Sequence, residues 1–260
     1  MRKIVKLVRR DIEVQVSGGG LSVELQVCTA LKAWARQEVQ DDAADIHGLS
    51  QQSITNICRR VALALASKAA QFIRMPSTLE EQEQVVSGFR NICGSKKGFS
   101  SLNVQVVCDA QLKIRDIVAH WRGSTHDAKI FRESQIRQRF ENVEFHARLQ
   151  GDSGYGLTNY LFTPAQNPRT AKEESYNKSH ILTRNTIERC FGVWKQRFRC
   201  LLLGFSVSLE NIKLYIVALA ILHNIAIEMN EGIDFLEPVT SEDNGDQQVL
   251  WEGLDSRSGQ

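Results

Sequence analysis

The sequence predicts an α/β protein in which a helical N-terminal region precedes a part that combines strands with helices. Apolar residues recur at helical spacing over 22–73. The runs SLNVQVVCDA and LKIRDIVAHW instead have the character of two adjacent strands joined at Asp109–Gln111. Helical spacing returns after Thr183. We therefore predict a helical region over residues 1–93, an α/β domain over residues 94–230, and an acidic disordered tail over residues 231–260.

The composition is ordinary for a soluble globular protein of 260 residues, with 42% hydrophobic and 24% charged residues. Its six cysteines include no C-x-x-C pair, which favours free thiols in a reducing compartment over disulfides or a zinc site. The basic start MRKIVKLVRR has too few apolar residues for a signal peptide, and the longest apolar run, Leu214–Leu222, is shorter than a membrane span. We expect an intracellular protein without a membrane segment.

Charge is distributed unevenly along the chain. Residues 94–213 contain 19 Lys and Arg against 11 Asp and Glu, whereas residues 226–260 contain 9 acids and only one basic residue, Arg257. A basic central part followed by an acidic tail indicates a negatively charged partner, of which nucleic acid is the commonest, although solubility alone also produces basic surfaces.

The helical region has the pattern of a helix-turn-helix unit. A short extended segment, IEVQV, precedes a glycine triplet, and Ser22 is then placed to cap a first helix. A second helix over Val39–Ile46 ends near Gly48, and Ser50 is placed to cap a third. The third helix offers polar side chains suited to base edges and phosphates, namely Gln51, Gln52, Ser53, Thr55, Asn56, Arg59 and Arg60. A plain three-helix packing unit is the alternative.

In the second part of the chain, segments with the apolar spacing of helices alternate with segments typical of strands. A helix ends at about Ile92, the two strands follow, and 125–140 returns to helical spacing. The segment LQGDSGY predicts a strand that ends at Asp152. Two helices over Thr183–Arg199 and Leu209–Met229 complete the prediction. His223 and Asn224 in the second are expected in the core, with their polar groups satisfied by hydrogen bonds.

Three acids stand at positions suited to metal binding. Asp127 begins a helix, Asp152 ends a strand, and Glu188 is a lone acid in a basic row on its helix. Clustered carboxylates hold Mg²⁺ or Mn²⁺, and such ions activate water and stabilise the leaving oxygen in phosphodiester cleavage. Each acid also has a structural alternative: a favourable charge at a helix start for Asp127, a turn for Asp152, and an ion pair with Arg184 for Glu188.

Five blocks of the chain resemble one known family. The blocks KKGFSSLNVQVVCDA, HWRGSTHDAKIFRES, LQGDSGYGLTNYLFTP, YNKSHILTRNTIERCFGVWKQRFRCL and IVALAILHNIAIE are similar, in order and spacing, to the Harbinger transposase-derived nucleases of the PIF/Harbinger DDE superfamily. The resemblance runs from about Leu21 to Glu228. The 35 residues between Asp152 and Glu188 are similar to the family's spacing between its second and third catalytic acids.

The resemblance implies an RNase H-like mixed sheet with flanking helices and a divalent-metal-dependent nuclease acting on DNA. It implies catalytic roles for Asp152 and Glu188 and metal binding by Asp127, Asp152 and Glu188 with Mg²⁺ or Mn²⁺. It further implies a nuclear location, with a cytoplasmic fraction, and a nuclear partner of the Myb/SANT-like DNA-binding class.

The chain departs from the family pattern at one point. The family has a segment of the form apolar-apolar-Asp-x-x-His ahead of KKGFSSLN, which is the first core strand with the first catalytic acid. Here GFRNIC runs directly into GSKKGF, and no acid occurs between Glu83 and Asp109. A catalytically inactive DNA-binding or adaptor protein is therefore the alternative to the nuclease, and a module that recruits a protein partner is a third hypothesis.

Overall fold

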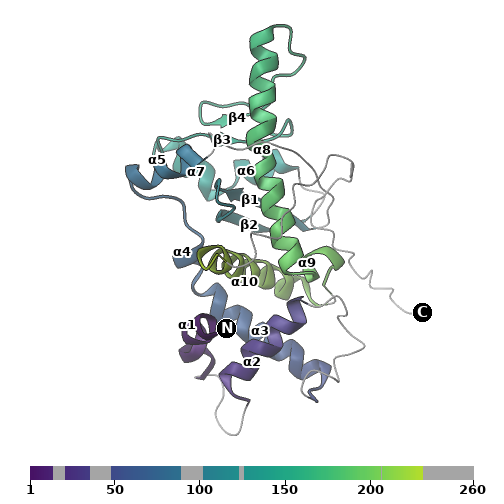
Figure 1. Ribbon diagram of the computed structural model, residues 1–260. Coiled ribbons are helices and arrows are strands. Elements are labelled where there is room, and N and C mark those ends of the chain that lie inside the picture. The colour runs from purple at the N-terminus through teal and green to yellow at the C-terminus, as the bar shows by residue number, and fades with distance from the viewer. Residues whose placement is uncertain (14–20, 36–47, 89–101, 123–125, 206, 231–260) are drawn as a thin grey trace, which may run out of the picture.

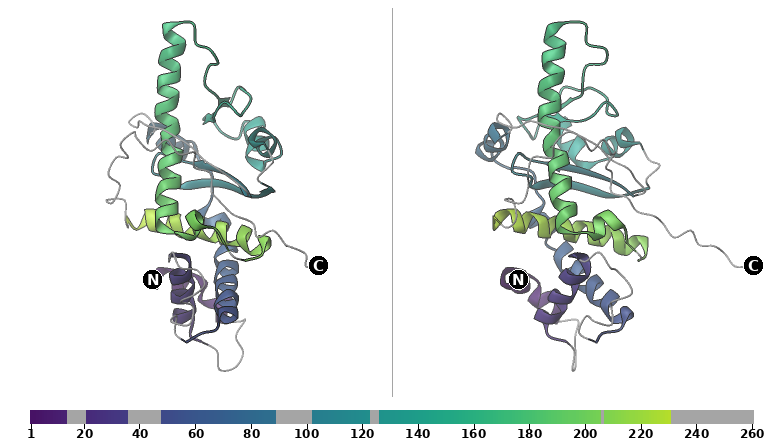
Figure 2. Two further views of the ribbon diagram at one scale, coloured as in Figure 1. Left: turned by 90° about the vertical axis from the view of Figure 1, so that its right-hand side faces the viewer. Right: turned by 45° about the vertical axis from the view of Figure 1, so that its right-hand side comes forward.

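The computed structural model describes residues 1–13, 21–35, 48–88, 102–122, 126–205 and 207–230. Its helices and strands make it an α/β protein, as the sequence predicts. The long helix α10 (Leu209–Glu228) crosses the molecule between a group of N-terminal helices and the strands, and α8 (Ala171–Arg197) stands roughly perpendicular to it (Figures 1 and 2). The predicted acidic tail lies outside the described residues.

The N-terminal group contains α1 (Arg2–Glu13), α2 (Val23–Ala35), α3 (Gln51–Ala66) and the short α4 (Ala69–Phe72). Ser22 and Ser50 cap α2 and α3, since their hydroxyls accept hydrogen bonds from the backbone N–H groups of Leu25 and Ser53. Gly48 adopts a φ of 65°, the left-handed turn that its position predicts. Apolar residues of α3 that recur at helical spacing are buried, namely Ile54, Ile57, Val61 and Leu65.

Part of the predicted extended segment near the N-terminus is helical. The extended conformation predicted for IEVQV is wrong at its first two residues, because Ile12 and Glu13 belong to the last turn of α1 and Ile12 is fully buried. The predicted helix Val39–Ile46 lies outside the described residues, so the helix-turn-helix unit stays a prediction. On α3, Gln51, Gln52, Asn56 and Arg59 are exposed as expected, whereas Arg60 donates a hydrogen bond to Gln26 of α2 (2.6 Å).

The core gathers around α10. Thirteen of its residues are buried, and the same apolar cluster includes side chains of α1, α2, α3, β2 and α8. By length and composition α10 could cross a membrane, but most of it is buried against these elements, as expected for a core helix. The predicted domain boundary at residue 93 lies outside the described residues and stays a prediction.

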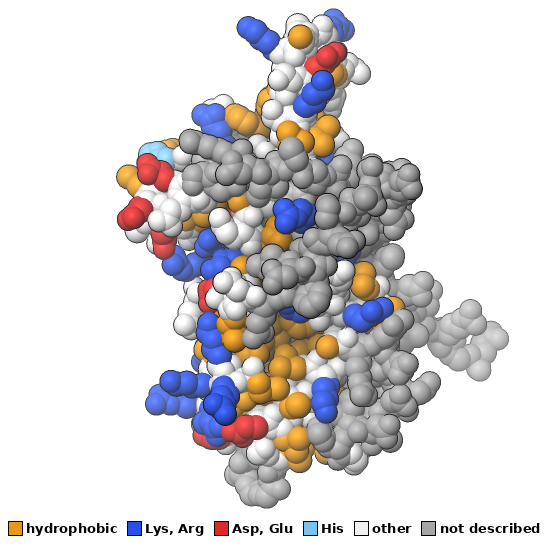
Figure 3. All heavy atoms as spheres, viewed as in Figure 1, with side chains coloured by type: hydrophobic (Ala, Val, Ile, Leu, Met, Phe, Trp, Pro, Cys, Tyr) orange, Lys and Arg blue, Asp and Glu red, His pale blue; other side chains and the backbone are white. Residues whose placement is uncertain are grey.

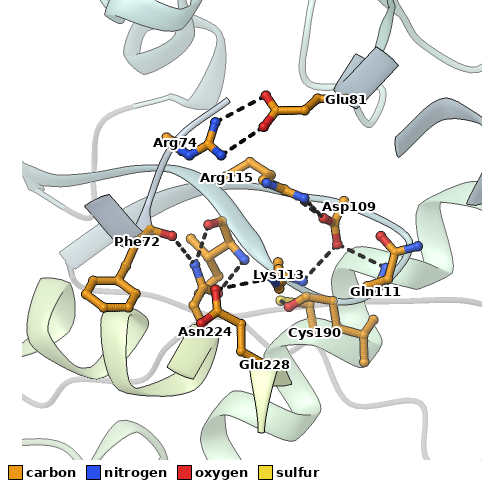
Figure 4. Close-up of polar contacts among 12 residues, drawn as sticks. Phe72, Arg74, Glu81, Asp109, Gln111, Lys113, Arg115, Cys190, Asn224 and Glu228 are labelled. Atoms are coloured by element: carbon orange, nitrogen blue, oxygen red, sulfur yellow. Dashed lines mark hydrogen bonds and ion pairs between the residues drawn. The ribbon is translucent and has the colours of Figure 1, made fainter. Parts of the chain in front are cut away.

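Strands β1 (Leu102–Cys108) and β2 (Ile114–Arg122) form an antiparallel hairpin, as the sequence predicts. Asp109 closes its turn: the buried carboxylate accepts hydrogen bonds from the N–H groups of Gln111 and Lys113 and pairs with Arg115 (Figure 4). Leu112 takes a left-handed φ of 64° in this turn. Asp109 thus stabilises the turn at the point where the sequence predicts that the two strands join.

The strand that ends near Asp152 is short. β3 (Leu149–Gln150) pairs in parallel with β4 (Leu161–Phe162), and the described strands form two two-stranded sheets, β1–β2 and β3–β4. The predicted helix over 125–140 is divided into α6 (Asp127–Arg132) and α7 (Gln135–Glu141), because the Ser134 hydroxyl caps a new helix at that point.

The remaining helices are α5 (Leu79–Gly88), α8 and α9 (Cys200–Leu203). α8 begins twelve residues before the predicted Thr183, at a capping box in which Thr170 and Glu173 satisfy each other's backbone N–H groups. Its first turns project from the rest of the molecule (Figure 1).

Candidate metal and nuclease site

The three candidate acids all line one cavity of about 920 Å³. It lies between β1 and the segment that contains β3, and α6, α7 and α8 supply further walls. Asp127, Asp152 and Glu188 therefore come from three separate elements to the lining of a single cavity.

Asp127 is the first residue of α6 and is half-buried. Its Oδ1 atom accepts a hydrogen bond from Asn103 Nδ2 at the start of β1 (2.6 Å). A carboxylate at a helix start is electrostatically favoured in any case. The contact with Asn103 adds a fixed orientation, because it ties α6 to the strand that lines the cavity.

Asp152 follows β3 by two residues and makes a turn. Its Oδ1 atom accepts a hydrogen bond from the N–H of Gly154 (2.8 Å), and its carbonyl accepts one from the N–H of Tyr155 (3.2 Å). A Cβ atom added at Gly154 would lie 3.0 Å from Asp152 Oδ1, so glycine suits this position. The turn role is thus observed, and it leaves the carboxylate at the cavity.

Glu188 is paired with Arg184 one helical turn earlier. The distance from Arg184 Nη2 to Glu188 Oε1 is 3.2 Å, and only 17% and 13% of the two side chains are exposed. The ion-pair alternative is thus present in the structure. Because both residues line the cavity, the pair is also part of the candidate site.

The hydroxyl of Tyr155 is affected by the charges of three of these residues. Its pKa is raised mainly by burial and further by the carboxylates of Asp127 and Asp152, whereas Arg184 lowers it. Neither Tyr155 nor Asn103 is predicted from the sequence. The only signal for Tyr155 is its position three residues after Asp152.

The donor set fits a hard divalent cation in its chemistry, since all three side chains offer carboxylate oxygens. Among the described residues, the Oδ2 atoms of Asp127 and Asp152 have no protein hydrogen-bond donor. The three acids are not gathered around one point, however: in the described part of the chain no group of three or more His, Cys, Asp or Glu residues is close enough to hold a metal ion. Binding of one ion by all three would therefore require their side chains to come closer together.

Comparison with known families identifies the class of protein to which this α/β chain belongs. The profile of the DDE superfamily endonucleases matches residues 69–224. The chain belongs to this family.

Named relatives are similar over most of their length. The chain is 30% identical over 244 residues to the human protein named "Putative nuclease HARBI1", an alignment that covers 82% of this chain and 69% of the human one. The Xenopus laevis protein of the same name is 27% identical over 92% of this chain and 77% of its own. "Protein ALP1-like" of Arabidopsis thaliana is 23% identical over 88% of this chain and 68% of its own. No solved structure matches the chain significantly. The Harbinger resemblance is thus confirmed.

Proposed function

We propose that the chain hydrolyses phosphodiester bonds of DNA with a Mg²⁺ or Mn²⁺ ion bound by Asp127, Asp152 and Glu188. The observation that carries the proposal is the convergence of these acids, from three elements, on the lining of one cavity. Membership of an endonuclease family and the names of the relatives support the reaction class. The proposal includes an RNase H-like arrangement of the core.

In this proposal the residues of the cavity have two roles, metal binding and phosphate binding. The chemistry that such an ion would supply is activation of water and stabilisation of the leaving oxygen. Asp127 and Asp152 hold the ion from positions fixed by Asn103 and by the turn at Gly154. Glu188 would serve as a ligand if it left Arg184, and the guanidinium of Arg184 would then be able to bind a DNA phosphate, for which its planar donor geometry is suited.

A cleavage assay on supercoiled plasmid with Mn²⁺ tests the proposal. We expect the wild type to nick the plasmid and Asp152→Asn and Glu188→Gln to lose at least about 100-fold in rate, because a lost ligand impairs positioning and charge compensation. Glu141→Gln is the matched control, since Glu141 forms the same type of pair with Arg137 at i,i+4 outside the cavity.

Two outcomes would count against the nuclease. Equal rates for the wild type and both site variants would place the activity elsewhere. A wild type that binds DNA in a salt-sensitive manner without any metal-dependent cleavage would support the inactive DNA-binding or adaptor protein instead.

We also propose that the protein acts in the nucleus, with a cytoplasmic fraction, and with a Myb/SANT-like DNA-binding partner. Both proposals rest on the family resemblance. Immunofluorescence of the tagged chain tests the location, and exclusion of the protein from the nucleus would contradict it.

A further inference from the structure

The cavity is bordered by the edges of two strands. Six consecutive residues of β1, 103–108, line it, and so do the seven consecutive residues 146–152 around β3. Neighbouring side chains of a strand point to opposite faces of its sheet, so a strand face would contribute every second residue. Consecutive residues indicate that each strand presents its edge.

The backbone of β3 supports this reading. The N–H groups of Leu149 and Gly151 donate to the carbonyls of Tyr160 and Phe162 and therefore point toward β4. The peptide groups of alternate residues point in opposite directions, so the N–H and carbonyl of Gln150 point toward the cavity. Among the described strands β1 pairs only with β2, and its other edge borders the cavity. The sheets β3–β4 and β1–β2 lie one above the other in Figure 1.

Two walls of the cavity are apolar. α8 contributes Ile187 and Phe191, one helical turn apart, and the cluster that includes Phe131, Phe140 and Phe145 contributes another wall. A strand that is covered by apolar walls carries apolar side chains on both of its faces. The charges of the lining also cancel. They are Arg115, Arg148 and Arg184 against Asp127, Asp152 and Glu188.

Two buried polar side chains of the lining lack partners among the described residues. Gln105 is 8% exposed and neither its amide nitrogen nor its amide oxygen has a hydrogen-bond partner. The Thr186 side chain is 1% exposed and its hydroxyl has none. Buried polar groups without partners are costly, and the backbone of an inserted strand offers both donors and acceptors.

The direction of the two edges is compatible with one inserted strand. Asn103 at the start of β1 contacts Asp127, and the charges of Asp127 and Asp152 both act on Tyr155. The start of β1 and the end of β3 thus lie at the same end of the cavity, and the two strands run in opposite directions. An inserted strand would pair antiparallel with one edge and parallel with the other, and both pairings are ordinary.

We infer that this cavity is a docking slot for one extended, uncharged and apolar strand of a second polypeptide, which would join β1–β2 and β3–β4 into a single sheet. The chain's own neighbouring segments fit poorly by sequence: 89–101 contains Arg90, Lys96, Lys97 and two glycines, and 231–260 is acidic. The inference goes beyond the proposed nuclease, since it requires neither metal nor DNA.

Fluorescence anisotropy with a labelled peptide tests the slot. The probe is a seven-residue peptide of Val, Ile and Thr with two C-terminal lysines for solubility, and its control has proline at the central position, which removes a backbone donor. We expect the full chain, without metal or DNA, to bind the probe at least about tenfold more tightly than the proline peptide, which corresponds to the loss of about one hydrogen bond. Equal binding of the two peptides, or no binding of either, overturns the inference.

A matched pair of variants locates the site. Gln150→Pro removes the N–H that points into the slot, whereas Gln150→Ala keeps it, and the Gln150 side chain is exposed. We expect Gln150→Pro to bind the probe at least about tenfold more weakly than Gln150→Ala, with both folded by circular dichroism. Equal affinities of the two folded variants would overturn the assignment to this edge. If Gln150→Pro does not fold, the peptide comparison decides.

Discussion

At the scale of single residues, Asn224 connects three parts of the chain. Its Oδ1 atom accepts from the N–H of Ile114, and its Nδ2 atom donates to the carbonyls of Ile114 and Phe72, each at 2.8 Å (Figure 4). The side chain is 1% exposed. It thereby joins α10 to the start of β2 and the end of α4.

We predict that Asn224→Ala lowers the free energy of unfolding by about 2–4 kcal/mol, because the backbone groups of Ile114 and Phe72 would remain buried without these partners. Urea unfolding measures the change. The control Asn142→Ala alters an exposed residue at the end of α7 and should change stability by less than about 0.5 kcal/mol. Similar values for the two variants would show that the Asn224 hydrogen bonds contribute little.

Lys195 makes stability depend on pH. Burial lowers the pKa of its ammonium group from the ordinary 10.5 to about 8. Between these values the unfolded chain binds a proton that the folded chain has released, so the free energy of unfolding increases with pH. It should rise by about 1–3 kcal/mol more in the wild type than in Lys195→Met between roughly pH 7 and pH 10. Parallel pH profiles from urea unfolding would contradict this.

Some contacts of the site can be predicted from the sequence and others cannot. The turn at Asp152 and the pair of Glu188 with Arg184 are local, and spacings of two and four residues predict them. The contact between Asn103 and Asp127 joins residues 24 positions apart. It depends on how β1 packs against α6, which no local pattern contains.

At the scale of elements, the projecting start of α8 depends on its cap. The Thr170 hydroxyl accepts from the N–H of Glu173, and Glu173 Oε2 accepts from the N–H of Thr170. The residues 171–176 that follow are all exposed, so tertiary packing contributes little to this end of the helix.

We predict that Thr170→Ala destabilises the first turns of α8 by about 1 kcal/mol and leaves global stability nearly unchanged. Hydrogen exchange of the amides within 174–178 should accelerate about fivefold, which is the factor that corresponds to this free energy. Lys172→Ala is the control in the same turn. If exchange in Thr170→Ala matched that of the control, the capping box would not be what holds this end of α8.

Elements with a clear apolar period are predicted well and others are not. The apolar run of α10 gives a helix that ends within one residue of the observed Glu228. α1 is absent from the prediction because its many basic residues obscure the buried stripe of Val5, Val8 and Ile12. The start of α8 is polar on all sides and therefore has no apolar stripe to recognise.

At the scale of the whole molecule, the arrangement of the two sheets around one cavity is not predictable from the sequence. Strands β3 and β4 have two residues each, too few for a period-2 signal. Their position relative to β1 arises in part from α8, which contacts both β1 and β3 and is distant from β1 in sequence.

Basic side chains gather on α1, where Arg2, Lys6 and Arg10 are exposed (Figure 3). Together with the basic central part of the chain, they predict DNA binding that depends on phosphate contacts. The affinity for a duplex should fall at least about tenfold between roughly 50 and 200 mM KCl, as counterion release requires. Replacement of the three α1 residues by Gln should flatten this dependence in a binding titration. Affinity that does not change with salt would exclude phosphate contacts as the basis of binding.

Calorimetric titration with Mn²⁺ shows whether the carboxylates of this cavity bind a divalent cation. We predict one site in the wild type and a loss of at least about tenfold in affinity in Asp152→Asn, in line with the effect of disturbing a metal site. Asp11→Asn, which alters an acid paired with Lys68 outside the cavity, should bind as the wild type does. Unchanged affinity in Asp152→Asn, or no binding of Mn²⁺ by the wild type, would contradict the account.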